Sequence, residues 1–140
     1  NDDTGDAAIF HCYTYSAHPV GAAAVIACLS ETERLDTKVN AQVRGTQLYK
    51  GVIELAKKHT IVGDVRGGHG LMLGIELVSD QNKKTQLDMI DMKKIHKKTY
   101  EFGDMVRLGL NNILMSPPLT ISENEVNQIL GALDEGLTAI

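Results

Sequence analysis

Apolar and polar positions along this 140-residue chain recur with periods that predict four helices and two pairs of strands. Residues 19–34 are almost continuously apolar as far as Leu29, and Pro19 suits a first helical turn. They predict a largely buried helix that enters solvent at Glu31. A second helix is predicted from apolar residues spaced by four and three, namely Ala41, Gly45, Leu48, Val52 and Leu55. Gly45 would allow this helix to pack closely against a neighbour.

Short apolar runs bounded by turn residues predict the strands. Residues 61–66 and 71–78 flank the sequence GGHG at 67–70, which predicts a strand, a glycine-rich hairpin turn and a second strand. One face of the second strand would carry Leu71, Leu73, Ile75 and Leu77. Residues 105–108 and 113–115 predict a second strand pair, and the two prolines at 117–118 prevent its continuation.

Two more amphipathic helices are expected in the second half of the chain. Residues 87–102 place a lysine-rich solvent face opposite an apolar face made of Met89, Met92, Ile95, Thr99 and Phe102. The last helix begins at a capping-box pair, Ser122 and Glu125, and continues with apolar residues at helical spacing. The order of elements predicts an α+β fold, a small sheet with helices packed on one side.

Composition narrows the class of protein. A chain of 140 residues with 43% hydrophobic residues is long enough to bury a core. Its net charge of -4, with acids and bases interspersed, predicts no nucleic-acid partner, and no apolar run approaches the roughly 20 residues of a membrane span. Only Cys12 and Cys28 occur, which favours reduced thiols and a cytoplasmic location. The chain begins without Met on a loop-like segment, which favours a fragment or processed product.

Short motifs for metal binding, hydrolysis and phosphate binding are incomplete in this sequence. His11, Cys12 and His18 lie close together, but their spacing fits no common ligand pattern, and we predict no metal site. Ser16 lacks the surroundings of a hydrolase nucleophile and is expected to cap the following helix. The glycine-rich segment at 67–70 lacks the Lys-Ser/Thr of a phosphate-binding loop, so a hairpin turn explains it.

Three separated blocks carry a family resemblance. Residues 10–19, FHCYTYSAHP, resemble the HG-aromatic-T-Y-S-G-H-P stretch of class III pyridoxal-phosphate aminotransferases, with Cys12 and Ala17 in place of the two glycines. Residues 62–78 are similar to VGDVRG-x-GLM-x-GIELV, in a loop one residue longer around Gly68 and His69. Residues 105–121 resemble VR-x-x-G-x-x-I-x-x-SPPL-x-I. The whole chain is similar to the C-terminal portion of that family.

The resemblance implies an architecture and two binding roles. Residues 1–34 would be the tail of a large α/β pyridoxal-phosphate domain, a phosphate-contacting loop and a connecting helix, and 35–140 the C-terminal small domain of a fold-type I transferase. Thr14 and the Tyr13 amide would bind the cofactor phosphate of a neighbouring subunit, which implies a homodimer. Arg107 would pair with a substrate carboxylate. Taken alone, Thr14 is more often a loop hydroxyl, and an arginine more often pairs with a surface acid.

The resemblance also implies what the chain lacks. In the family, the lysine that joins the cofactor covalently and the carboxylate that holds the pyridine nitrogen precede residues 10–19. Lys50, Lys57 and Lys93 lie on amphipathic helices among other charges, where no depressed pKa is expected. We therefore predict no catalytic residue in this chain and no activity of the chain by itself.

The function implied for the complete enzyme is transfer of an amino group from an amine or ω-amino acid to a keto acid such as pyruvate. Two alternatives stay open. The chain could act only as a non-catalytic dimerisation or folding module, or the parent could be an aminomutase or a decarboxylating enzyme of the same fold.

Overall fold

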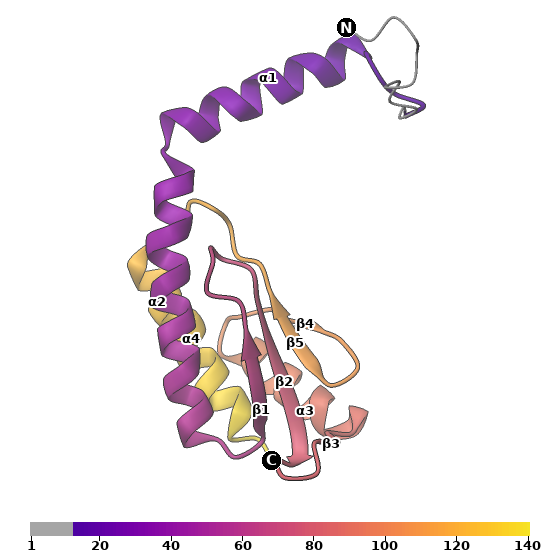
Figure 1. Ribbon diagram of the computed structural model, residues 1–140, viewed down its shortest axis with the longest axis vertical. Helices are drawn as coiled ribbons and strands as arrows, with labels where there is room; N and C mark the ends of the chain where they lie inside the picture. The colour runs from indigo at the N-terminus through magenta and orange to yellow at the C-terminus, as the bar shows by residue number, and fades with distance from the viewer. Residues whose placement is uncertain (1–12) are drawn as a thin grey trace, which may run out of the picture. The chain divides into compact units, whose positions relative to one another are not determined.

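The computed structural model describes residues 13–140, and the chain divides into two compact units, Asn1–Leu35 and Asp36–Ile140 (Figure 1). In the first unit, α1 spans Pro19–Arg34, the bounds expected from the sequence. Its N-cap is His18, whose ring Nδ1 accepts a hydrogen bond from the Gly21 amide at 3.4 Å. The prediction that Ser16 caps this helix is wrong, because the Ser16 hydroxyl instead accepts from the Tyr13 amide at 2.9 Å.

The expected burial of α1 is also wrong. None of its residues is buried, and Val20 and Ile26 are 72% and 65% exposed. Burial requires a second element to pack against, and α1 is the only helix or strand among the described residues of its unit. The apolar residues therefore predicted the helix correctly but not the exposure of its side chains.

The second unit consists of three helices and five strands. They are α2 (Thr37–Lys58), β1 (Val62–Arg66), β2 (Leu73–Asp80), β3 (Thr85–Gln86), α3 (Met89–Glu101), β4 (Arg107–Leu108), β5 (Asn112–Met115) and α4 (Glu123–Leu137). The strands form one antiparallel sheet in the order β1-β2-β5-β4, and β3 pairs with the end of β2. The sequence did not predict β3, because two residues are too few to show an alternation.

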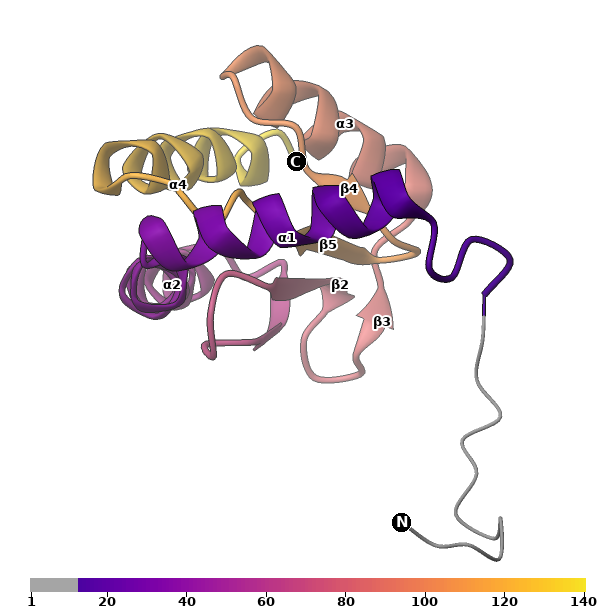
Figure 2. The same ribbon diagram turned by 90° about the horizontal axis from the view of Figure 1, so that it is seen from above.

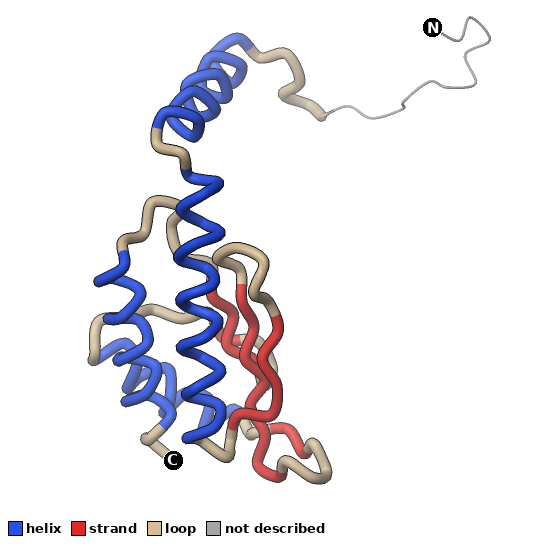
Figure 3. Tube along the Cα trace, turned by 60° about the vertical axis from the view of Figure 1, so that its left-hand side comes forward, coloured by secondary structure: helices blue, strands red, loops and turns tan. Residues whose placement is uncertain are grey.

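The predicted α+β fold with helices on one side of the sheet is confirmed (Figures 2 and 3). Leu73, Ile75 and Leu77 of β2 point to one face, where each is at most 3% exposed. The helices cover that face with Leu48, Val52, Met92, Ile95, Val126, Leu133 and Leu137. Burying these side chains is the main source of stability for this unit. None of the helices in residues 13–140 combines the length and apolar character that crossing a bilayer demands.

The glycine-rich hairpin between β1 and β2 packs closely on α2. Gly67, Gly68 and Gly70 have φ angles of +137°, +94° and +92°, which L-residues with side chains rarely adopt. A Cβ atom on Gly45 of α2 would overlap the carbonyl group of Gly70. The expected close approach at Gly45 is therefore present, but its partner is the hairpin backbone and not another helix.

Polar contacts fix the two ends of the helical layer. The predicted capping box at α4 is confirmed, since the Ser122 hydroxyl accepts from the Glu125 amide at 3.3 Å and the Glu125 carboxylate accepts from the Ser122 amide at 2.7 Å. Where α2 ends, Asp134 of α4 accepts from Lys58 at 2.7 Å and lies 2.6 Å from Nε2 of the buried His59. These contacts, from Lys58 first and then His59, lower the pKa of Asp134.

Replacing Asp134 by asparagine is expected to destabilise the fold by about 1 kcal/mol at pH 7, because the ion pair with Lys58 and the charge-assisted bond to His59 are both lost. The folded pKa of Asp134 lies below the unfolded value near 4. Its carboxylate therefore stabilises the fold above that pH, and the contribution disappears as pH falls through the folded pKa. Urea unfolding at pH 7 and pH 3 checks this, since the gap between wild type and D134N should narrow at pH 3. An equal gap at both values would contradict it.

Candidate functional site

The sheet has an outer face that the helices leave uncovered. Side chains alternate along β2, so Gly74 and Glu76 point away from the buried face that carries Ile75. Cross-strand partners share a face, and the register pairs Gly74 with Arg66 on one side and with Leu114 on the other. Leu114 in turn pairs with Arg107. Arg66, Gly74, Leu114 and Arg107 therefore form one row across four strands, which we call the outer row.

A broad hollow of about 1500 Å³ is lined in part by this face and extends to α4, whose Glu125, Gln128 and Ile129 also line it. Its lining includes the whole outer row, together with His69 of the hairpin and Asp104 from the segment between α3 and β4. His69 belongs to the loop that is one residue longer here than in the motif that residues 62–78 resemble. The hollow is lined both by Arg66 of β1 and by Arg107 of β4, which lie far apart in the sequence. They share one face because the strand order β1-β2-β5-β4 places both strands in the same sheet.

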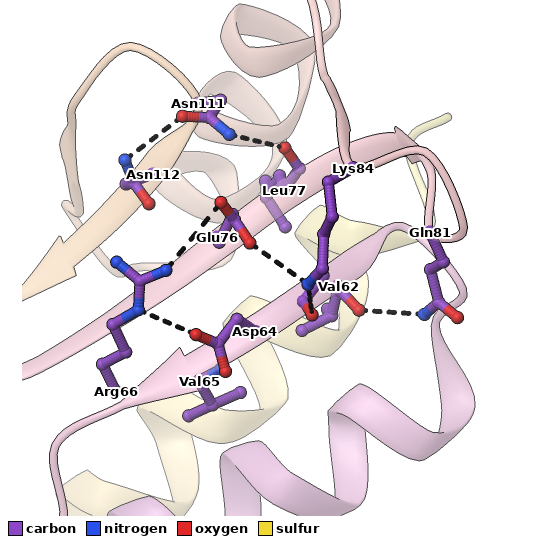
Figure 4. Close-up of polar contacts among 11 residues, drawn as sticks. Val62, Asp64, Val65, Arg66, Glu76, Leu77, Gln81, Lys84, Asn111 and Asn112 are labelled. Atoms are coloured by element: carbon purple, nitrogen blue, oxygen red, sulfur yellow. Dashed lines mark hydrogen bonds and ion pairs between the residues drawn. The ribbon is translucent and has the colours of Figure 1, made fainter.

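The two arginines of the outer row differ in their partners. Arg66 donates to Asp64 at 2.7 Å and lies 4.0 Å from Glu76, which also binds Lys84 at 3.4 Å (Figure 4). The hydrogen bond between Arg66 and Asp64 lowers the pKa of Asp64 and raises that of Arg66. Arg107 is exposed and makes no salt bridge within residues 13–140. The free guanidinium of the outer row is therefore that of Arg107.

Asp104 is a polar group of the hollow that sequence reasoning missed. One of its carboxylate oxygens is buried and accepts no hydrogen bond from any part of the chain that the structure describes. Burial raises the pKa of this carboxyl. Nothing in the local pattern distinguishes Asp104 from a surface acid next to Gly103, because its burial depends on how the chain leaves α3 and enters β4.

Tyr13 and Thr14 lie in the first unit, in a turn that immediately precedes α1. The amide of Ser16 donates to the Tyr13 carbonyl at 3.0 Å, and Ala17 completes the turn with a φ of +60°. This left-handed residue stands where the resembling motif has glycine. The Tyr13 amide is occupied by the Ser16 hydroxyl, whereas the exposed Thr14 hydroxyl makes no hydrogen bond with another described residue. Thr14 is therefore the more available donor of the pair.

The three lysines considered in the sequence analysis lie on the solvent-facing sides of helices. Lys50 and Lys93 are exposed on α2 and α3, and Lys57 binds Glu54 at 2.6 Å on the solvent face of α2. Within residues 13–140, no group of three His, Cys, Asp or Glu side chains could hold a metal ion. His11 and Cys12, weighed above as metal ligands with His18, lie outside the described residues.

Comparison with known proteins places the fold in one class. The family model described as aminotransferase class-III matches residues 3–137. An amine transaminase from an uncultivated Pseudomonas species, solved with pyridoxal phosphate bound, superposes with a TM-score of 0.85 and 36% identity, over 94% of this chain and 30% of the other. "Uncharacterized aminotransferase YodT" of Bacillus subtilis is 32% identical over 97% of this chain and 33% of its own length. "Leucine/methionine racemase" of Thermococcus litoralis is 30% identical over 93% and 29%.

The helical layer and one-sided antiparallel sheet match part of a fold-type I transaminase. The chain belongs to the class-III aminotransferase family. It spans about a third of the length of the relatives that it matches. The family resemblance and the fold predicted from the sequence are thus confirmed.

Proposed function

We propose that the protein containing this chain is a pyridoxal-phosphate-dependent aminotransferase, which moves an amino group from an amine or ω-amino acid to a keto acid such as pyruvate. The observation that carries the proposal is the free guanidinium of Arg107, held on a strand at the edge of a hollow in a class-III fold. A planar guanidinium binds a carboxylate through two parallel hydrogen bonds. Arg107 would hold and orient the carboxylate of an amino acid or keto acid.

Thr14 fits the role of a ligand to the cofactor phosphate. Its hydroxyl is exposed and unbonded among the described residues, and it stands in the turn before the N-terminus of α1. Hydroxyl groups and the positive end of a helix dipole both favour a phosphate dianion. Bound pyridoxal phosphate supplies an electron sink for the substrate carbanion. The Tyr13 amide would join Thr14 after exchanging its bond to Ser16.

Three further features of the complete enzyme belong to this proposal. Residues 1–34 would be the end of a large cofactor domain and 35–140 the small domain. The lysine that joins the cofactor would come from outside this chain. A homodimer would bring Thr14 of one subunit to the cofactor of the other, so that the site needs both.

Replacing Thr14 by alanine in the full-length protein is expected to weaken pyridoxal phosphate binding about tenfold or more, the value of a hydrogen bond to a charged group. Titration of the cofactor, followed by its visible absorption, measures the change. Thr14→Ser should restore most of the affinity, and Thr46→Ala, at an exposed position of α2, is the matched control. Unchanged affinity in T14A would remove Thr14 from the site.

A same-fold reaction other than transamination is the second candidate, because one relative is named a racemase. Incubating the full-length protein with an amino donor, pyruvate and pyridoxal phosphate, and then analysing the products, separates the two. Alanine together with the donor's carbonyl product supports transamination. An inverted or decarboxylated amino acid without alanine contradicts it.

A further inference from the structure

Gly74 occupies the middle of the outer row, and its own backbone does not require glycine. Its φ angle lies outside the left-handed region, unlike those of Gly67, Gly68, Gly70 and Gly103. A glycine inside a strand costs roughly 0.5 to 1 kcal/mol relative to alanine, because it loses more backbone entropy on folding. Backbone conformation therefore gives no reason for glycine at this position.

Packing gives no reason for glycine at this position either. A Cβ atom on Gly74 would meet only Cδ2 of Leu114, at an ordinary contact distance of 3.6 Å. In contrast, a Cβ atom on Gly63 of the neighbouring strand would lie 2.7 Å from Cγ1 of Val78, which requires a shift. A glycine inside a strand often marks a bulge, a bend or a place where a ligand or another backbone approaches closely. The strand register has no irregularity at Gly74, so close approach is the reason that remains. Gly74 is one of the residues that line the hollow.

The neighbours of Gly74 define the chemistry of that ligand. Neighbouring strands lie about 4.8 Å apart, so Gly74 is roughly 10 Å from the backbone of Arg107, with the 44% exposed Leu114 between them. Moving from Arg107 toward Gly74, the outer row presents a free cation, an apolar side chain and a bare backbone. This order matches a molecule with a carboxylate at one end and an apolar body behind it.

A second carboxylate on the same ligand would bind poorly beyond Gly74. The next residue of the row, Arg66, already binds Asp64, and Glu76 lies two residues along β2 on the same face. A dianionic ligand would have to displace Asp64 or approach the Glu76 carboxylate, which repels it. The outer row therefore favours monocarboxylates over dicarboxylates.

We propose that Gly74 determines substrate size, because the apolar body of a monocarboxylate substrate lies over Gly74 and Leu114 while its carboxylate binds Arg107. The inference rests on the carboxylate-binding role proposed above for Arg107. It adds the substrate class, which is monocarboxylates with a bulky alkyl or aryl group.

The test uses the full-length protein and two unreactive acids, propionate and 4-phenylbutyrate, whose binding is followed by ligand-observed NMR. Replacing Gly74 by leucine fills the space over the strand. It should weaken 4-phenylbutyrate at least tenfold and leave propionate within about twofold, since the tenfold change corresponds to about 1.4 kcal/mol of lost contact. Gly131→Leu is the matched control, because a side chain there projects from α4 into open space. It should leave both affinities unchanged.

The outcomes separate this inference from the proposed function. If R107A weakens both acids while G74L changes neither, Arg107 keeps its role and the inference about Gly74 is wrong. If R107A weakens neither acid, the proposed carboxylate site is wrong and the inference is overturned with it. If G74L weakens both acids equally and alters the sedimentation coefficient, polypeptide and not substrate covers Gly74. That outcome also overturns the inference.

Discussion

Replacing Arg107 by alanine in the full-length protein is expected to lower kcat/KM for a carboxylate-bearing amino donor at least about thirtyfold, while kcat/KM for a simple amine stays within about threefold. Thirtyfold corresponds to about 2 kcal/mol, the usual cost of losing a charge-assisted hydrogen-bonded pair. The loss should be confined to carboxylates because Arg107 makes no salt bridge within residues 13–140 that its removal would disturb. Parallel assays with an ω-amino acid and a matching amine without the carboxylate measure the difference.

Arg66 provides the control for this experiment. It lies on the same face of the sheet and in the same row, but Asp64 and Glu76 already neutralise its charge. Arg66→Ala removes a similar volume and the same formal charge, so it should affect both substrates by a similar and small factor. Equal losses for the two substrates in R107A would show that Arg107 supports the fold or the cofactor, and would remove it from substrate recognition.

The sequence predicted the elements more reliably than their environments. Apolar spacing indicated both strand pairs and every helix, because an amphipathic face leaves a periodic trace whatever it packs against. The predicted burial of α1 was wrong because apolar residues such as Val25 and Leu29 indicate an apolar surface but not whether another element packs on it. The N-cap of α1 was assigned to Ser16 instead of His18, because the turn from Tyr13 to Ala17 takes up the serine hydroxyl.

The site could be predicted only in part. Thr14 and Arg107 were predicted as site residues through resemblance alone, because neither has a local pattern that distinguishes it from an ordinary loop hydroxyl or surface arginine. Gly74 could have been noticed as an interruption of the alternation from Leu73 to Leu77, but its position beside Arg107 depends on the order β2-β5-β4. Strand order and register are long-range properties, and the burial of Asp104 is of the same kind.

Placing valine at Gly45 is expected to destabilise the fold by about 3 kcal/mol, the upper range for overpacking a buried site. Gly45 is buried on α2, and even one added carbon would overlap the carbonyl group of Gly70. Neither partner can move easily, because Gly45 is held by helical hydrogen bonds and Gly70 by a hairpin whose glycines already use left-handed φ angles. The midpoint of urea unfolding at constant m-value measures the loss.

The same substitution at Gly131 isolates the contact from helix propensity. A Cβ atom on Gly131 meets nothing within 4 Å on the exposed side of α4, so Gly131→Val should change stability by no more than about 0.5 kcal/mol. A G45V protein as stable as G131V would mean that the hairpin is not fixed against α2. The loss matters beyond stability, because the hairpin that Gly45 supports carries His69 at the hollow and follows directly on Arg66. The helix that stabilises the core therefore also supports one wall of the hollow.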